Sequence, residues 1–319
     1  MSTAVGWLAF GVIISALLAL DLGVFHRRPH EVRAREAATW WAIWLGLAVA
    51  FNVAVLLTRG VPKGLEFTTG YLIELSLSVD NVFVFVLLFH YFRVPARFQH
   101  RVLFWGIVGA LIMRGLMIAA GVLLIARAHW VLYVFGAFLL YSAYRMARPG
   151  EIEIHPEANP VLRLARRLVP MTRGYAGRRF FVRLPRRGGG LGGWAATPLF
   201  LVLLVVETTD VVFAVDSIPA IFGVTRDPFI VYTSNIFALL GLRSLYFVVA
   251  AVIRRFRYLR PALAAILGFV GLKMLLSDVV PVPIGVSLGV VATVLAVGAL
   301  ASLLRPADRA ASAGPERDP

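Results

Sequence analysis

The chain has 319 residues, of which 60% are hydrophobic and only 15% are charged, and its mean hydropathy is +0.82. Soluble domains average about 45–50% apolar and about 25% charged residues, so this composition excludes a single soluble domain and predicts a polytopic membrane protein. The net charge of +15 would suggest nucleic acid as the partner of a soluble chain, and the absence of cysteine excludes disulfides, thiolate metal sites and cysteine catalysis.

Long apolar runs predict an all-α bundle of about nine membrane-spanning helices within residues 1–304. A helix needs about 20 apolar residues to cross the hydrocarbon core of a bilayer. The first run is followed, not preceded, by arginines, which indicates a retained span and not a cleaved signal peptide. The runs lie at about 5–25, 39–58, 67–91, 102–126, 129–147, 197–222, 229–252, 258–277 and 283–304.

Basic residues alternate between the connections of these spans. The connections after the first, third, fifth, seventh and ninth spans are rich in arginine, whereas the others carry few basic residues. The positive-inside rule therefore predicts that the N-terminus lies outside and the C-terminus in the cytoplasm. Since topology accounts for the excess positive charge, we expect anionic lipid headgroups at the basic loops and no nucleic acid.

The connection at 148–196 is predicted to be a basic cytoplasmic loop. Its prolines and the run GGGLGG are typical of an irregular linker, and VLRLARRL at 161–168 predicts an interfacial helix within it. The last residues, 305–319, are predicted to form a disordered cytoplasmic tail.

Two segments of three spans each, at about 67–147 and 197–277, resemble each other. The matched residues, at separations of 130, 129 and 128, are Asp80 with Asp210, Arg114 with Arg243, and Arg145 with Lys273. Because each unit holds an odd number of spans, spans three to five and six to eight are predicted to be inverted repeats. Inverted repeats recur in secondary transporters, whose substrate site lies near the midplane, so the pattern indicates transport.

Charged side chains inside the predicted spans are the candidate functional residues. A charge at the centre of a span costs on the order of 2.5–3.5 kcal/mol on insertion scales, so five carboxylates in two spans indicate a function. With a neighbouring amide they form an all-oxygen set, which suits hard divalent cations such as Mn(II), Ca(II) and Mg(II). The candidate metal ligands are Glu74, Asp80, Asn81, Glu207, Asp210 and Asp216.

Helical geometry divides the acids of the sixth span. Glu207 and Asp210 share a face, whereas Asp216 lies about 180° from Glu207 on a regular helix. Pro219 removes one backbone hydrogen bond, so we expect a kink or break at 215–219 that turns Asp216 toward the same cavity.

The same carboxylates admit a structural interpretation. Arg114, Arg243 and Lys273 also lie within predicted spans and could neutralise the acids as buried ion pairs. Catalysis has no support, because the sequence contains no Gly-rich phosphate loop, nucleophile–base pair or HExxH motif. We therefore expect neither an enzyme nor a resident cofactor.

The acidic motifs ELSLSVDNVFVF at 74–85 and TPLFLVLLVVETTDVVFAVDSIPAIF at 197–222, with TSNIFALLGLRSLYF at 233–247, resemble the TerC family of integral membrane proteins, in particular its Alx-like branch. The resemblance runs from about residue 5 to 304. It implies a multi-pass protein of the plasma (inner) membrane that belongs to the LysE-type transporter superfamily, with the five carboxylates as metal-site acids. Members are associated with manganese export and metal homeostasis, and the family name comes from tellurium resistance.

The leading hypothesis is export of a divalent cation through an acidic midplane site by alternating access, with Mn(II) as the preferred candidate for the cation. Export of Ca(II) is the second hypothesis. The third is a membrane scaffold or assembly factor without transport activity, docked through its basic loop. The scaffold predicts that neutralising Asp80 leaves function intact while deleting 150–190 abolishes it, and the transporter predicts the reverse. No oligomeric state is indicated.

Overall fold

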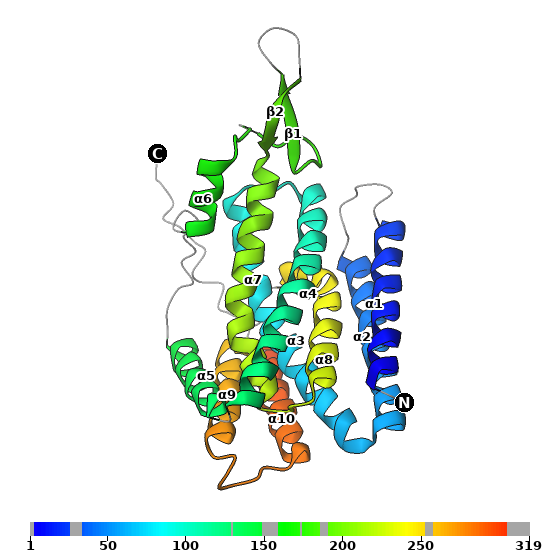
Figure 1. Ribbon diagram of the computed structural model, residues 1–319, viewed down its shortest axis with the longest axis vertical. Coiled ribbons are helices and arrows are strands. Elements are labelled where there is room, and N and C mark those ends of the chain that lie inside the picture. The colour runs from blue at the N-terminus through cyan, green and yellow to red at the C-terminus, as the bar shows by residue number, and fades with distance from the viewer. Residues whose placement is uncertain are drawn as a thin grey trace.

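The computed structural model describes most of the chain as an elongated helical bundle (Figure 1). The predicted tail at 305–319 lies outside the described residues, which are 3–25, 34–128, 130–148, 159–172, 174–185, 191–252 and 258–304.

Nine helices of the described residues coincide with the nine predicted apolar runs. They are α1 (Thr3–Phe25), α2 (Ala34–Arg59), α3 (Val61–Tyr91), α4 (Ala96–Arg127), α5 (Val131–Ala147), α7 (Pro198–Phe222), α8 (Pro228–Val252), α9 (Leu259–Leu275) and α10 (Ile284–Leu304). Within the described parts, α2, α3, α4, α7, α8 and α10 are long and apolar enough to cross a membrane. The all-α membrane bundle is therefore confirmed, while nine crossings remain a prediction because α1, α5 and α9 are not among these six helices.

The 148–196 connection contains a helix at the predicted place. Helix α6 (Pro160–Leu168) begins at Asn159, whose side-chain oxygen accepts hydrogen bonds from the backbone N–H groups of Val161 (2.9 Å) and Leu162 (3.3 Å). This bond pattern satisfies N–H groups that have no partner within the helix. The Asn159 amide also donates to Thr208 Oγ1 of α7 at 2.8 Å, so α6 is fixed to the bundle.

The same connection also contains a hairpin, so the prediction of an irregular linker is wrong there. Strand β1 (Phe181–Pro185) pairs antiparallel with β2 (Leu191–Ala196), with Arg183 opposite Trp194. Of the residues that suggested a linker, Pro185 ends β1, and Gly192 and Gly193 lie near the start of β2, where they do not prevent pairing. Tyr175 then donates to the carbonyl oxygen of Phe92 at 2.7 Å, which ties the loop to the end of α3.

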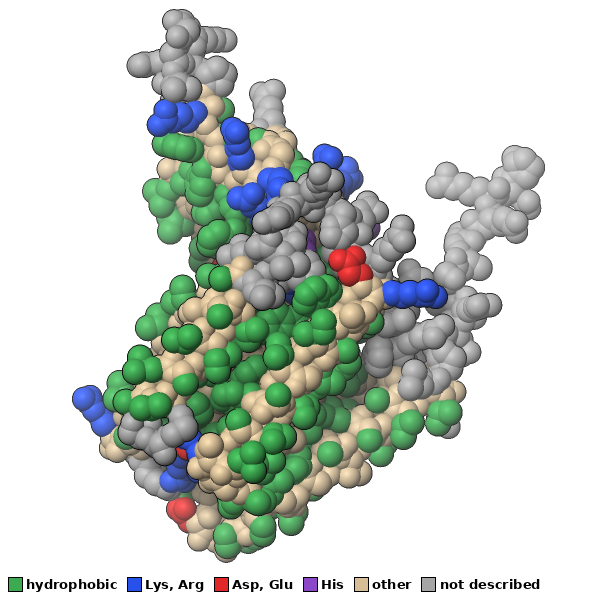
Figure 2. Space-filling model, turned by 90° about the vertical axis from the view of Figure 1, so that its right-hand side faces the viewer, with side chains coloured by type: hydrophobic (Ala, Val, Ile, Leu, Met, Phe, Trp, Pro, Cys, Tyr) green, Lys and Arg blue, Asp and Glu red, His purple; other side chains and the backbone are tan. Residues whose placement is uncertain are grey.

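Consecutive long helices run in alternate directions (Figure 1). The turn from α3 to α4 lies at the end of the bundle that carries α6 and the hairpin, whereas the turns from α2 to α3 and from α7 to α8 lie at the other end (Figure 1). Several Lys and Arg side chains gather around the hairpin end, and hydrophobic side chains cover the visible flank of the bundle (Figure 2). Lys and Arg side chains are also visible at the opposite end of the bundle (Figure 2).

The helices that contribute candidate residues pack in three main pairs. Helix α3 packs on α8, α4 on α7, and α5 on α9, while α3 and α7 also touch each other. Helices α1 and α2 stand at one flank, with α2 against α3 and α8 (Figure 1). Helices α3 and α7, which carry all six candidate ligands, are therefore at the centre of the bundle.

Helix α7 passes through Pro219 without interruption, so the expected break at 215–219 is wrong. The helix is continuous to Phe222. Proline removes a single hydrogen bond here, close to the end of the helix, and its neighbours Ala220 and Ile221 are fully buried against other helices. Asp210 and Asp216 consequently keep the different directions that a regular helix gives them.

Candidate functional site

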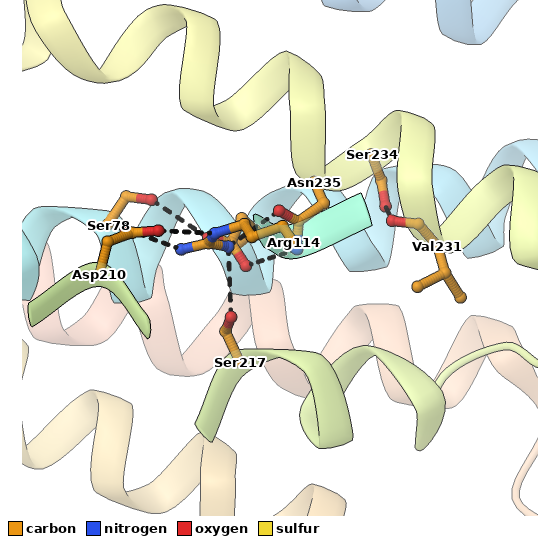
Figure 3. Close-up of polar contacts among 8 residues, drawn as sticks. Ser78, Arg114, Asp210, Ser217, Val231, Ser234 and Asn235 are labelled. Carbon is orange, nitrogen blue, oxygen red and sulfur yellow. Dashed lines mark hydrogen bonds and ion pairs between the residues drawn. The ribbon is translucent and has the colours of Figure 1, made fainter. Parts of the chain in front are cut away.

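A fully buried arginine holds two of the candidate acids. Arg114 of α4 forms one ion pair with Glu74 of α3 and another with Asp210 of α7. The contact with Asp210 measures 3.4 Å from Nε to Oδ2 (Figure 3). Its Nη1 also donates to Asn235 Oδ1 of α8 at 2.8 Å and to Ser217 Oγ of α7 at 3.3 Å. These residues are called the arginine network, and they join α3, α4, α7 and α8.

Both oxygens of Glu74 have protein donors. Asn235 Nδ2 donates to Oε2 at 3.0 Å, and Ser78 Oγ donates to Oε1 at 3.5 Å beside the ion pair with Arg114. The side chains of Arg114 and Glu74 are 0% exposed, and that of Asp210 is 5% exposed. Glu74 and Asp210 thus match the structural interpretation, in which a buried charge is stabilised by a paired and hydrogen-bonded opposite charge.

Three other candidate ligands line a cavity on a different side of α7. Asp80 and Asn81 of α3 and Asp216 of α7 face a space of about 320 Å³ between α3, α5, α7 and α9. Ser142 of α5 lines it too and donates to Asp216 Oδ1 at 2.7 Å. This space is called the acidic cavity. A water molecule occupies about 30 Å³ in the liquid, so the acidic cavity has room for a hydrated cation.

Two arginines share the acidic cavity with the acids. Arg145, near the end of α5, and Arg260, near the start of α9, both line it. Their positive charges balance the carboxylates of Asp80 and Asp216. Without them, two negative charges would stand inside the membrane-spanning bundle with no cation nearby. The acidic cavity therefore offers carboxylate, amide and hydroxyl oxygens, and the two arginines in its wall counter the charge of the carboxylates.

Glu207 belongs to neither group. Its half-buried carboxylate lies against Gly109 of α4, where a Cβ atom would collide with both carboxylate oxygens. Among the described residues, no three His, Asp or Glu side chains come together as a metal-binding group. The structure thus divides the six predicted ligands into the arginine network, the acidic cavity and Glu207.

Some polar residues of the site were not among the candidates from the sequence. Asn235 stands in a polar Thr-Ser-Asn run inside an apolar span, and this run is a signal that could have identified it. Ser142, Ser217 and Arg260 have no such local signal, because a single serine or an arginine near a span end is ordinary in a membrane helix.

The chain is similar to one family over most of its length and to several proteins over nearly its whole length. The model of the family described as "Integral membrane protein TerC family" matches residues 59–310. The chain is 50% identical over 299 residues to "Uncharacterized membrane protein STKORF319" of Myxococcus xanthus, covering 94% of this chain and 92% of that protein. It is 48% identical over 304 residues to "Putative membrane-bound redox modulator Alx" of Escherichia coli strain K12, covering 92% and 93%. No solved structure matches the chain significantly.

Proposed function

The chain belongs to the TerC family of integral membrane proteins, and from this premise we propose that it is a transporter, not an enzyme, which exports a hard divalent cation, Mn(II) first. The observation that carries the proposal is the acidic cavity. There the oxygens of Asp80, Asn81 and Asp216 face an open space, whereas those of Glu74 and Asp210 are held by Arg114.

The donor set of the acidic cavity suits a hard cation. Carboxylate, amide and hydroxyl oxygens are ligands that Mn(II), Ca(II) and Mg(II) accept, and no sulfur ligand from cysteine is available in this chain. Entry of a cation between Asp80 and Asp216 would weaken their attraction to Arg145 and Arg260. Ca(II) remains the alternative cargo, and it prefers more oxygen ligands in a looser cage.

The helix packing supports inverted repeats built from α3–α5 and α7–α9. In such repeats α3 corresponds to α7, α4 to α8 and α5 to α9. Exchanging each helix for its counterpart turns the pair α3–α8 into the pair α7–α4 and leaves the pair α5–α9 unchanged. All these pairs are in contact. Rocking of one such unit against the other is the usual route to alternating access around a central site.

We also propose that the hairpin end faces the cytoplasm across the plasma membrane, with the N-terminus outside. Helix α6 supports this orientation because Leu162 is buried against the bundle while Leu164 and Leu168 are exposed beside arginines. Such a helix binds a bilayer surface with anionic headgroups. The arginines concerned are Arg163, Arg166 and Arg167.

The name of the Escherichia coli relative refers to redox modulation. Because this chain has no cysteine, we propose that a redox effect here would follow from the transported metal and not from thiol chemistry. Manganese is a redox-active metal, so a change in its cellular content is such an effect.

The test is the manganese content of a manganese-sensitive host. Wild type, Asp80→Asn and Asp216→Asn are compared at matched membrane levels, with Asp278→Asn as the control. Asp278 is an exposed carboxylate outside the acidic cavity that accepts a hydrogen bond from Tyr133. We expect wild type and the control to lower cellular manganese and the two cavity variants to fail.

Other outcomes would contradict the proposal in different ways. An unchanged manganese content with wild type removes Mn(II), and the same comparison with calcium then tests Ca(II). Normal export by both cavity variants means that the acidic cavity is not the site. Full function of Asp80→Asn together with loss of function on deleting 150–190 would favour the scaffold.

A further inference from the structure

A second cavity lies at the other end of the helices that form the acidic cavity. It measures about 570 Å³, and its walls include Lys63 and Glu66 of α3, Leu132 of α5, Gly223 after α7 and Lys273 of α9. This space is called the lysine cavity. It is lined by the ends of α3, α5, α7 and α9 that lie away from the hairpin (Figure 1).

A layer of buried apolar side chains separates the two cavities. Its members are at most 1% exposed and belong to one hydrophobic cluster. That cluster also includes Leu77, which lines the acidic cavity, and Leu132 and Met274, which line the lysine cavity. The residues between, called the apolar barrier, are Ile73, Leu139, Ala220, Leu267 and Val270.

All four helices pass the two cavities and the apolar barrier in the same order. Read from the acidic cavity through the apolar barrier to the lysine cavity, the residues are Asp80, Ile73 and Glu66 on α3; Ser142, Leu139 and Leu132 on α5; Asp216, Ala220 and Phe222 on α7; and Arg260, Leu267 and Lys273 on α9. At 1.5 Å per helical residue, the stretch of α3 covers about 21 Å along its axis. Four helices with one shared order outline a single route through the bundle.

We propose that the lysine cavity is the exit compartment of this route, where a hydrated divalent cation arrives from the acidic cavity after the apolar barrier opens. This inference rests on the proposed function and assigns it a second site. In the structure the apolar barrier is closed, because its aliphatic side chains are buried against one another. A cation cannot give up its hydration water within such a layer.

The charges of the lysine cavity suit release, not retention. Lys63 Nζ lies 2.8 Å from Glu66 Oε2 and 3.5 Å from Asp227 Oδ2, and Arg59 also pairs with Asp227 at 3.5 Å. Lys273 Nζ donates to Ser287 Oγ at 2.9 Å. The carboxylates already have partners, so an arriving cation meets ammonium groups and low affinity, in contrast with the acidic cavity.

The contact that holds the apolar barrier shut is the crossing of α5 and α9. A Cβ atom on Gly271 would lie 2.9 Å from the carbonyl oxygen of Gly136 and 3.1 Å from Cβ of Leu139. A Cβ atom on Gly136 would lie 3.0 Å from the carbonyl oxygen of Gly271. Glycines that let two helix backbones touch are a common means of close packing in membranes. Opening of the apolar barrier therefore requires α5 and α9 to separate here.

Single cysteines can test the route without background, because the chain has none. Met146→Cys reports on the acidic cavity, Val282→Cys on the lysine cavity and Ala220→Cys on the apolar barrier. A membrane-impermeant methanethiosulfonate is applied to right-side-out and to inside-out vesicles. Leu168→Cys and Val279→Cys, at exposed positions on the two ends of the bundle, identify the face that is labelled.

We expect Val282→Cys to react from the face of Val279→Cys, and Met146→Cys from the face of Leu168→Cys. Ala220→Cys should react about tenfold or more slowly than either, since an open conformation of low population is what exposes it. Addition of Mn(II) should change the rates at Met146→Cys and Val282→Cys in opposite directions.

The two proposals fail separately. Reaction of both cavity cysteines from the same face, or fast reaction of Ala220→Cys from both faces, overturns the exit compartment whatever the cargo. If the protein exports Mn(II) but Mn(II) changes the labelling rate of neither cavity cysteine, the exit compartment is overturned as well. The expected labelling pattern without export of manganese overturns the metal assignment alone.

Discussion

Asp210 and Asp216 lie on one uninterrupted helix, yet they have entirely different partners. Asp210 Oδ2 is 3.4 Å from Nε of the buried Arg114, whereas Asp216 Oδ1 accepts a hydrogen bond from Ser142 Oγ at 2.7 Å in the acidic cavity. Six residues turn a regular helix by about 240°, so α7 presents one acid to each side. A structural ion pair and a candidate transport ligand are thus built into the same motif.

Loss of the Arg114 charge should destabilise the protein strongly. Arg114→Met leaves Glu74 and Asp210 buried without their cation, and breaking a buried pair in this way costs about 3–5 kcal/mol. We expect a lower melting temperature and a lower yield of folded protein in detergent. The triple variant Arg114→Met, Glu74→Gln, Asp210→Asn removes all three charges and should recover part of the loss. A melting temperature of Arg114→Met equal to that of wild type would contradict a structural role for the network.

Neutralising Asp210 and Asp216, both on α7, should have different consequences. Asp210→Asn weakens a charged hydrogen bond inside the bundle and should cost about 1–3 kcal/mol of stability. Asp216→Asn keeps a partner for Ser142 beside an open cavity, so its melting temperature should stay near that of wild type while Mn(II) binding is lost. Melting curves and titrations with Mn(II), measured on the same two preparations, check this. Equal stability losses would mean that Asp216 is also part of the packed core.

The sequence predicts the positions of the helices well, because a run of apolar residues is a local property. It also identifies the acids, since a charge in such a run is conspicuous. The direction in which each acid points, and therefore its partner, is not a local property of the sequence. Glu74 meets Arg114 across 40 residues of chain and Asp210 meets it across 96, so their pairing depends on how four helices pack. The sequence admitted such pairs as an alternative without selecting the partner.

The error at Pro219 has the same origin. A proline removes a hydrogen bond wherever it stands, but whether a helix then breaks depends on the packing around it. Here Ala220 and Ile221 are buried completely, which keeps the last turn of α7 in place. The hairpin in the 148–196 connection was missed because its short strands are stabilised by contacts with the rest of the loop, such as the hydrogen bond from Ala196 N to the carbonyl oxygen of Pro170 at 2.8 Å.

Adding a methyl group at Gly271 should force α5 and α9 apart. The new Cβ would lie 2.9 Å from the carbonyl oxygen of Gly136, and overpacking of this kind costs about 1–3 kcal/mol. We expect Gly271→Ala to lower the melting temperature and to increase labelling of Ala220→Cys. The matched control is Gly289→Ala on α10, where a Cβ meets nothing within 4 Å. Similar behaviour of the two variants would show that the crossing does not close the apolar barrier.

Two substitutions at Asn159 should separate the two tasks of this residue. Asn159→Asp keeps an oxygen for the N–H groups of Val161 and Leu162 but loses the donor to Thr208, whereas Asn159→Ala loses both. Loss of the cap costs about 1 kcal/mol of helix stability. Limited trypsin digestion at the arginines of α6 should therefore be fastest in Asn159→Ala and intermediate in Asn159→Asp. Thr39→Ala, at an exposed hydroxyl of α2, should match wild type. Equal digestion rates in all four proteins would mean that α6 is held to the bundle by Leu162 alone.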